Sequence, residues 1–445
     1  MYNFPKDLFT DVRIERKHAV RYAYWNEEVV SDLTIDTEGA KIRIYDGEMW
    51  YTSTTEDLDR IQEEIDNLAG IAKPNATIYE DPMIRNFGAE KADVLCFNGE
   101  NDNRKVTREQ YVSLVQSYKE KCTDPSIEEI KAASVGLTLS HLEKEYYSSK
   151  GAAIRQDMQE CRFGMFFDVV VNGVTTNAGK SYLVNSFDKL YGKEDEIFAE
   201  RDRYMDYAKN AVDVVPGNYT CVLAPIVTAM FTHESFGHKS EADFMLNDKT
   251  LRDEWVMGKK VGNEKVSICD RGDLLNHGYA PYDDEGNKST VVYLIRNGVL
   301  TGRLHDSNSA AVLGEAVTGN ARAQDYECSP IVRMTNTFME PGSDSPEEMI
   351  SGIKDGIYVY GVNYGTGNST FTMQPNLCYR IRDGKLCEPL RVNVVTGTVF
   401  QTLFDIDAVG TDFVLFDTFT CGKGGQSMPV SAGGPTIRVK SLTIS

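Results

Sequence analysis

The stretch FTHESFGHKS, residues 231–240, holds the side chains of this sequence that are best suited to bind a metal and activate water. His233 and Glu234 are adjacent, and His238 follows five positions after the first histidine. Many zinc peptidases carry H-E-x-x-H on a helix, where the histidines bind zinc and the glutamate acts as general base. The residue types therefore indicate metal-assisted hydrolysis, although these histidines are one residue further apart than in that motif.

The five-residue spacing restricts the helix that carries the two histidines. Four residues of an α-helix turn the chain by about 400°, whereas five residues turn it by about 500° and leave the side chains about 140° apart. Both rings can reach one ion only if the helix widens into a π-bulge or loosens before His238, and Gly237 eases such a distortion. We therefore predict that the backbone hydrogen bonds near residues 235–238 depart from the α-helical pattern.

The segment before the motif, CVLAPIVTAMFT, is apolar on almost every side, which predicts a buried helix. Buried polar side chains must be paired or must bind something. One interpretation is that hydrogen-bonding partners satisfy each of His233, Glu234 and His238 separately. The other is that they share a metal ion and the chemistry of its bound water, with the glutamate taking the proton from that water.

A catalytic zinc ion usually has three protein ligands and one open position, so the two histidines leave one ligand to find. Glu241 and Asp243 are close in sequence, His277 and His305 are distant, and nine cysteines are spread along the chain. Cys421 differs from the other cysteines because FDTFTCGKGGQSMPV places it at the end of an apolar strand, just before a glycine-rich turn. A thiolate suits zinc, but a cysteine that merely closes a strand is an equally valid interpretation.

The elements that must position these residues fall into two parts, with a boundary at Pro216-Gly217 that breaks any helix. We expect an α+β fold with an N-terminal domain of hairpins and helices at residues 1–215. The patterns predict these N-terminal elements: a hairpin in 41–54 that turns at Asp46-Gly47, a helix over 58–68, one or two helices in 105–147, a hairpin that turns at Asn172-Gly173, and a charged helix in 193–214.

Residues 216–445 predict a β-rich domain, mostly antiparallel and arranged as a barrel or sandwich. Asn297-Gly298 and Asp383-Gly384 are hairpin signals within it, and one helical segment at about 226–246 carries the two histidines. The glycine-rich stretch GVNYGTGNST, residues 361–370, either lines a substrate cleft or simply connects two strands.

Composition limits the class of protein and its surroundings. The 445 residues carry a formal net charge of -20, which disfavours nucleic acid and anionic membranes as partners. The sequence has no apolar run approaching the length of a membrane span and no apolar signal core near the N-terminus. No C-x-x-C occurs among the cysteines, which argues against a disulfide framework or a zinc ribbon. We expect a cytoplasmic protein whose cysteines are mostly reduced.

One segment of the sequence resembles a phosphate-binding loop, which would be a second class of site. GVTTNAGKSY, residues 173–182, ends in Gly-Lys-Ser like such a loop. Five residues separate Gly173 from Gly179, however, where the motif requires four, and the segment falls in a predicted hairpin rather than between a strand and a helix. Both observations argue against a nucleotide-binding enzyme.

Four segments of the second half resemble the TldD/PmbA family of zinc peptidases. They are HESFGHKSEADF at 233–244, DDEGNKSTVVYLIRNGVLTGRLHDSNSA at 283–310, RMTNTFMEPG at 333–342 and CGKGGQSMPVSAGGPTIRV at 421–439. The resemblance covers nearly all of the second half and is looser over residues 1–215. Since the His-Glu-x-x-x-His motif is present, the sequence resembles the zinc-binding, TldD-type subunit.

The resemblance implies a zinc peptidase whose metal ligands are His233, His238 and Cys421, with Glu234 as the catalytic base. It also implies a homodimer, or a heterodimer with a TldE/PmbA-type paralogue, that admits unfolded peptide but not folded protein. The alternative function is a non-catalytic, peptide-binding partner subunit in which the metal is structural or absent. Cleavage of a generic peptide that a chelator abolishes would distinguish the two.

Overall fold

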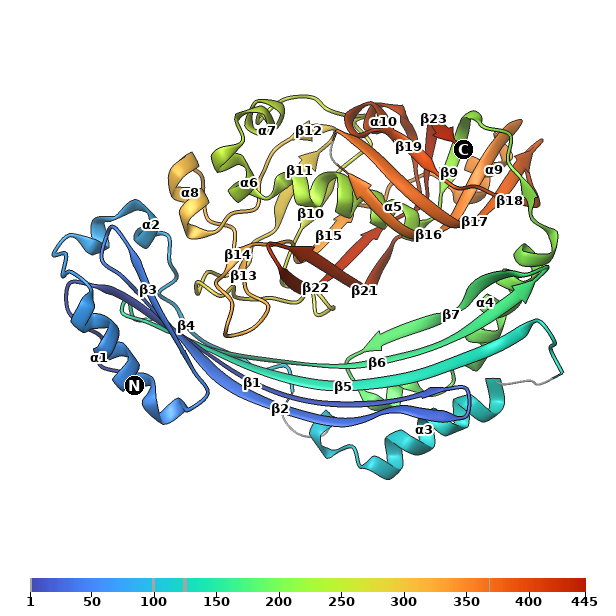
Figure 1. Ribbon diagram of the computed structural model, residues 1–445. Coiled ribbons are helices and arrows are strands. Elements are labelled where there is room, and N and C mark those ends of the chain that lie inside the picture. The colour runs from blue at the N-terminus through green and yellow to red at the C-terminus, as the bar shows by residue number, and fades with distance from the viewer. Residues whose placement is uncertain (1, 98–100, 123–125, 368) are drawn as a thin grey trace.

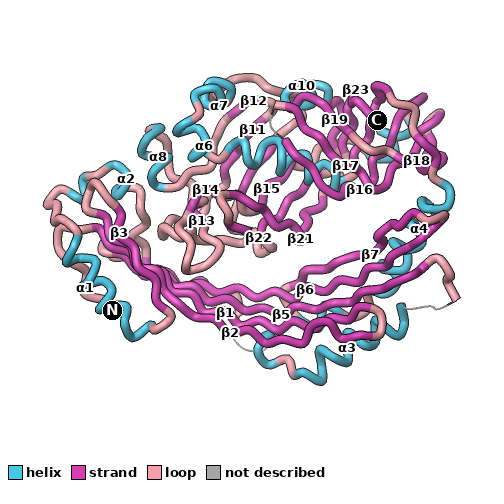
Figure 2. The backbone as a smooth tube through the Cα atoms, viewed as in Figure 1, coloured by secondary structure: helices cyan, strands magenta, loops and turns pink. Residues whose placement is uncertain are grey.

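The structure is a computed structural model that describes residues 2–97, 101–122, 126–367 and 369–445. A long, curved and mostly antiparallel sheet from the first half of the chain forms one layer, and a β-rich body from the second half lies against its concave side (Figure 1). Strands outnumber helices in both layers (Figure 2). The predicted α+β class is confirmed.

The first sheet has the strand order β3-β2-β1-β5-β6-β4, and β7 pairs with β6 as well. Its central strands are long, with β1, β5 and β6 spanning 17, 19 and 19 residues. The strands of this sheet are β1 (Phe9–Trp25), β2 (Glu28–Tyr45), β3 (Trp50–Thr55), β4 (Lys91–Val94), β5 (Ile130–Ser148), β6 (Ala153–Val171) and β7 (Val174–Val184).

Helices cover this sheet with apolar faces at helical spacing. α1 (Ile61–Ile71) buries Ile61, Ile65 and Leu68 against β1 and β2, as the predicted helix over 58–68 requires. α3 (Arg108–Cys122) lies on the convex side (Figure 1), and both α3 and α4 (Glu194–Asn210) pack on alternating residues of β5 and β6. A further, short α-helix of this half is α2 (Pro82–Arg85).

The prediction of helices throughout 105–147 is wrong in its second half. Among the described residues of 106–147, α3 is the only helix, and Ile130–Ser148 forms β5 in the middle of the sheet. Along β5, Val135, Leu137 and Leu139 are buried at every second position, which is the period of a strand. Pairing with β1 and β6 on its two sides decides the conformation of this segment, and those partners are distant in sequence.

The second half folds mainly into two sheets, and one of them closes into a barrel. Neighbouring strands pair in the order β16-β9-β23-β19-β17. The ring is complete because β16 also pairs with β17. Of the predicted barrel or sandwich, the barrel is the arrangement that forms. The strands of this sheet are β8 (Val212–Asp213), β9 (Gly217–Leu223), β16 (Asp355–Gly367), β17 (Thr370–Arg382), β18 (Lys385–Arg391), β19 (Val395–Thr398), β20 (Ile406–Val409) and β23 (Ile437–Ile444).

The other large sheet of this half has the order β12-β11-β10-β15-β22-β21, so that β21 is a terminal strand. Its strands are β10 (Ile268–Asp270), β11 (Val292–Arg296), β12 (Val299–Leu300), β15 (Asn336–Met339), β21 (Val414–Lys423) and β22 (Gln426–Gly434). A small pair, β13 (Ala321–Arg322) and β14 (Ile331–Val332), lies beside it. The helices of this half are α5 (Pro225–Thr232), α6 (Ala242–Asn247), α7 (Lys249–Glu254), α8 (Ser307–Leu313), α9 (Pro346–Ser351) and α10 (Val399–Asp405).

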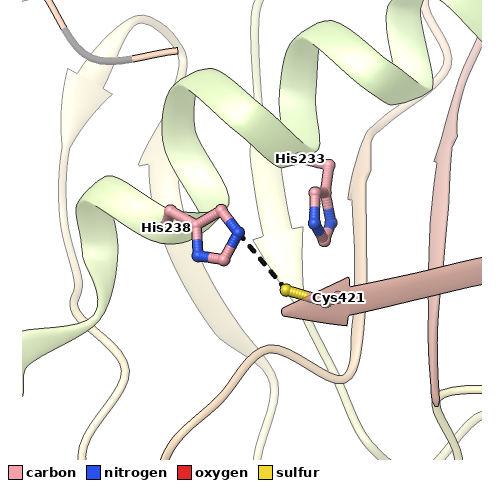
Figure 3. Close-up of side chains that lie close together, drawn as sticks. All are labelled: His233, His238 and Cys421. Atoms are coloured by element: carbon pink, nitrogen blue, oxygen red, sulfur yellow. Dashed lines mark hydrogen bonds between the residues drawn. The ribbon is translucent and has the colours of Figure 1, made fainter. Parts of the chain in front are cut away.

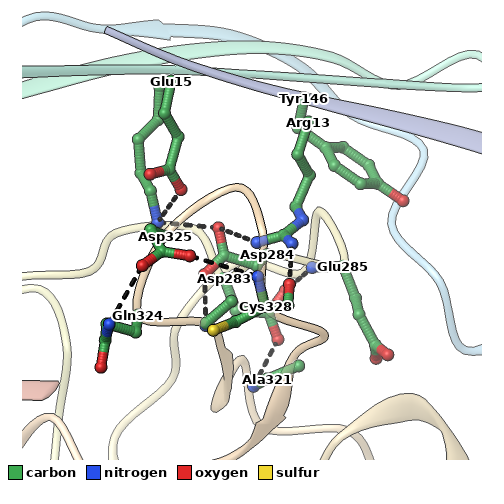
Figure 4. A network of polar contacts seen from close by, with 12 residues as sticks. Arg13, Glu15, Tyr146, Asp283, Asp284, Glu285, Ala321, Gln324, Asp325 and Cys328 are labelled. Atoms are coloured by element: carbon green, nitrogen blue, oxygen red, sulfur yellow. Dashed lines mark hydrogen bonds and ion pairs between the residues drawn. The ribbon is translucent and has the colours of Figure 1, made fainter. Parts of the chain in front are cut away.

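A buried polar network joins the first sheet to the loop at 283–287 of the second half (Figure 4). Lys144 of β5 lies 2.8 Å from Asp284 and 3.3 Å from Glu15, and Arg13 lies 3.6 Å from Asp284. Asp283 accepts hydrogen bonds from the backbone N–H groups of Asn287 and Ala321, at 2.8 and 3.0 Å. Charged groups from both halves therefore neutralise one another at this contact.

The four predicted hairpins form, although at Asp46-Gly47 only the glycine has positive φ. Asn172-Gly173, Asn297-Gly298 and Asp383-Gly384 each have positive φ at both residues, which is the conformation of a type I′ turn. The phosphate-loop-like segment forms part of the β6–β7 hairpin. The cysteines are free, and most of them are buried. Within the described ranges, no helix is long and apolar enough to cross a membrane.

Candidate metal centre

The helix that carries the histidines is broken at the motif, as the spacing predicts. α5 runs to Thr232, and one π-helical turn follows from His233 to Gly237, where the His238 N–H donates to the His233 carbonyl, five residues back. A 3₁₀ turn from His238 to Ser240 ends this segment before α6. The extra residue in the turn brings both imidazole rings to the same side, which a regular α-helix would not do.

Gly237 permits this turn for a reason other than backbone freedom. Its φ of -57° is an ordinary helical value, so no left-handed conformation is required. A Cβ atom at this position would instead lie 1.9 Å from the sulfur of Met334, which packs directly against the turn. The sequence correctly marks Gly237 as special, but the close approach of Met334 explains why.

His233, His238 and Cys421 converge on one point between the broken helix and β21 (Figure 3). One ligand atom from each lies within 4.8 Å of the other two. The Cys421 sulfur is 3.3 Å from the Nε2 atom of His238, and the two imidazole rings are 5.2 Å apart between centroids. Cys421 is 183 residues beyond His238, so only the fold brings them together.

The donor set fits a zinc ion. Tetrahedral zinc with bonds of about 2.3 Å to sulfur and about 2.05 Å to nitrogen places those two atoms about 3.6 Å apart, close to the observed separation. The Nδ1 atom of His233 is buried and has no hydrogen-bond partner in the described part of the chain. A buried ring nitrogen that lacks a hydrogen-bond partner needs an explanation, and coordination of a cation would provide one.

The electrostatic surroundings differ between the two histidines. Burial, together with the neighbouring His238 and Arg333, lowers the pKa of His233 to about 3, so this ring is neutral and free to bind a cation. Burial also acts to lower the pKa of His238, but hydrogen bonds to Cys421 and Glu241 outweigh it and raise that pKa to about 10. Burial raises the pKa of Glu234, and His238 opposes this shift.

Cys421 is held in place by the backbone around it. It is 2% exposed and pairs with Met428 across the β21–β22 ladder. The guanidinium of the fully buried Arg333 donates to the Cys421 and Gln426 carbonyls, and so ties both strands together. After Cys421, no neighbouring atom lies within 4 Å of a Cβ built on Gly422, so the space beside this residue is open.

The rival ligands that the sequence offered have partners of their own. His277 contacts Glu160 at 2.5 Å, and His305 contacts Glu315 at 2.8 Å, away from the three-residue group. Asp243 accepts two hydrogen bonds from Lys423, at 2.7 and 2.8 Å. Glu241 lies behind His238, on its Nδ1 atom, rather than beside Cys421.

An open cleft of about 770 Å³ lies next to the group and is lined by His238, Gly422 and Lys423. Gly367 and Ser369 of the β16–β17 hairpin also line it, while Asn368 between them is outside the described residues. The stretch 361–370 therefore both connects two strands and borders the cleft. A Cβ atom on Gly367 would lie 2.7 Å from the Glu234 carbonyl, so this hairpin packs on the backbone of the motif itself.

Comparison with known proteins identifies the family. Residues 216–445 match the family model described as the PmbA/TldA metallopeptidase C-terminal domain. A zinc metalloprotease TldD homolog of Saccharolobus solfataricus is 30% identical over 460 residues, which cover 98% of this chain and 96% of the relative. A metalloprotease of Methanothermobacter thermautotrophicus is 33% identical over 323 residues, 70% of each chain.

Solved structures share the fold at lower sequence identity. A putative modulator of a DNA gyrase from Thermotoga maritima superposes with a TM-score of 0.77 at 15% identity, covering 98% of this chain and 96% of that one. TldE from Thermococcus kodakarensis superposes with a TM-score of 0.74 at 16% identity, again over 98% of this chain. The matched family model and the names of the two relatives matched by sequence both describe metallopeptidases. The chain belongs to the TldD/PmbA family.

Proposed function

We propose that this chain is a TldD-type, zinc-dependent peptidase that hydrolyses unfolded or small peptides. His233, His238 and Cys421 would hold the zinc ion, and Glu234 would act as general base. The observation that carries this proposal is the convergence of three zinc-type ligand atoms from a broken helix and a distant strand. The metalloprotease names of the relatives at 30–33% identity support the same class of reaction.

The roles of the residues follow from their positions. A zinc ion bound here would supply the Lewis-acid activation of a water molecule. Glu234 follows the first histidine in the π-helical turn, and burial raises the pKa of its carboxyl group toward the range useful for proton transfer. In the proposed reaction Glu234 accepts the proton of the attacking water and then donates it to the leaving amine.

An extended peptide is the substrate shape that suits the surroundings of the site. β21 carries Cys421 and is the terminal strand of its sheet, and such an edge can pair with the backbone of an added strand. The open space beside Gly422 and the adjoining cleft leave room for that backbone. Recognition through the main chain would accept many sequences but would require the peptide to be unfolded.

The proposal extends to partners and location. A TldE protein is among the structures that share this fold, so we propose pairing with a TldE/PmbA-type paralogue or with a second copy of this chain. We propose a cytoplasmic location. We expect neither nucleic acid nor membrane as partner, since the net charge is -20.

The function is tested by peptidase assay of the purified protein, alone and with a TldE-type paralogue, on an unstructured fluorogenic peptide. We expect cleavage that a zinc chelator abolishes and that added zinc restores. Zinc-loaded protein that binds the peptide in both preparations without cutting it would instead support the non-catalytic, peptide-binding alternative.

A further inference from the structure

Glu241 lies directly behind the metal-binding group and is held rigidly there. Its backbone forms a parallel bridge to Leu304, and its N–H donates to the His238 carbonyl at 3.2 Å. The residue is 0% exposed, and its Oε2 atom lies 3.0 Å from the Nδ1 atom of His238. A buried carboxylate in this position can orient the ring of a candidate ligand and offset positive charge near it.

The contact selects one tautomer of His238. An ionised carboxylate only accepts hydrogen bonds, so the Nδ1 atom of the ring must carry the proton that is shared with Glu241. The other nitrogen, Nε2, then has a free lone pair in the neutral ring, and this atom faces the Cys421 sulfur at 3.3 Å. The carboxylate therefore fixes both the orientation of the ring and the nitrogen that is available to an ion.

The same carboxylate is connected to the strand that carries the third candidate ligand. Lys423, two residues after Cys421 on β21, places its ammonium 3.2 Å from Glu241 and 2.7 Å from Asp243. Its side chain is 7% exposed and also donates to the Val332 carbonyl at 2.9 Å. Glu241 thus joins the helix of His238 to the strand of Cys421 without any metal.

A divalent ion at the three-residue group would balance the charges of this arrangement. Zinc with two neutral imidazoles and one thiolate has a net charge of about +1. Glu241, Asp243 and Lys423 together carry one excess negative charge at a site where uncompensated charge is unfavourable. The buried group of charges behind His238 therefore complements the metal group in front of it.

We infer that Glu241 is a positioning residue for the metal centre, one that orients His238 and compensates the charge of the bound ion. This inference rests on the proposed zinc site and assigns a role to a residue that is not a ligand. Partners of this kind typically change metal affinity by about 10–100-fold when they are replaced. Glu241→Gln keeps the shape and size of the side chain but removes its charge.

The test measures zinc affinity in the full-length protein by competition with a chromophoric chelator, and compares Glu241→Gln with Glu315→Gln. The control also pairs a carboxylate with a buried histidine, because Glu315 lies 2.8 Å from His305, and neither residue belongs to the three-residue group. We expect zinc affinity to fall about 10–100-fold in Glu241→Gln and to stay unchanged in Glu315→Gln. The visible absorption of the cobalt-substituted protein should shift in Glu241→Gln alone, since it reports ligand geometry and not stability.

A measurement on the wild-type protein covers the case in which Glu241→Gln does not fold. With ¹⁵N-labelled histidine, the zinc-loaded protein should show His238 protonated at Nδ1 and bound to metal through Nε2, and the opposite tautomer would overturn the inference. Wild-type zinc affinity together with an unchanged cobalt spectrum in Glu241→Gln would also overturn it, while leaving the zinc site intact. A wild-type protein that binds no zinc would contradict the proposed function itself.

Discussion

Two buried polar clusters of this molecule resemble each other in composition and differ in how their charges are satisfied. The network around Asp284 joins the two layers, and Lys144 and Arg13 overcome the effect of burial to lower the pKa of Asp284 to about 2. The cluster around Cys421 leaves the Nδ1 atom of His233 without a partner. A cluster that contains its own counterions fixes architecture, whereas one that lacks a cation is suited to bind one.

The largest expected effect comes from removing a ligand of the second cluster. His233→Ala or His238→Ala should reduce the zinc content of the purified protein to background and abolish peptidase activity, because two ligands of this set do not hold a catalytic zinc ion firmly. Elemental analysis of the folded variants measures this directly. Full zinc occupancy in either variant would show that the ring in question is not a ligand.

Replacing Glu234 should separate chemistry from metal binding. Glu234→Gln should retain zinc and lose about 10²–10⁴-fold in kcat, the usual effect of losing a general base. The measurement combines steady-state kinetics with zinc analysis of the same preparation. Turnover near the wild-type rate would place the base elsewhere, and loss of zinc would make Glu234 part of the metal site.

A substitution in the network around Asp284 should reduce stability without changing zinc binding. Asp284→Asn leaves Lys144 and Arg13 buried beside a neutral side chain, which should reduce the free energy of unfolding by about 3–5 kcal/mol. Zinc bound per folded chain should stay the same. Urea denaturation and zinc analysis test both statements, and a variant of unchanged stability that binds less zinc would remove the contrast between the clusters.

A smaller, pH-dependent effect is expected from Glu285 in the same network. Burial and the neighbouring Asp306 raise the pKa of Glu285 from 4.5 to about 7 in the folded protein. The folded state therefore binds more protons than the unfolded state between these values, and the contribution of this group to stability is lost as the pH rises through about 7. The Glu285→Gln variant lacks this titrating group and therefore its pH-dependent contribution. Its free energy of unfolding relative to wild type should increase between pH 4.5 and 7. A constant difference across that range, measured by urea denaturation, would contradict the assignment.

Much of the fold follows from local signals in the sequence, and what does not follow depends on distant contacts. The type I′ turns at Asn172-Gly173 and Asn297-Gly298 are set by two residues each, so their hairpins were predictable. The helical prediction for Ile130–Ser148 was wrong because its partners β1 and β6 decide its conformation. The break at the motif was predictable, since the spacing of the histidines contradicts a regular helix.

The candidate site divides in the same way. His233 and His238 are recognisable from their spacing, but Cys421 is 183 residues away, and its place before a glycine-rich turn left it ambiguous until the family resemblance indicated it. Glu241 was considered as a rival ligand, and the structure places it behind His238 instead. Lys423 was not identified at all, because its partners Glu241 and Asp243 are far away in sequence and no local pattern points to them.

The proposed three-residue zinc centre is tested most directly by measuring the zinc content of Cys421→Ala beside Cys122→Ala. Both cysteines are buried, but Cys122 lies on α3 in the core beneath the first sheet. We predict about one zinc ion per chain in the wild type and in Cys122→Ala, and background zinc without peptidase activity in Cys421→Ala. Full zinc content in Cys421→Ala, with activity that a chelator still removes, would contradict the thiolate ligand and require a carboxylate in its place.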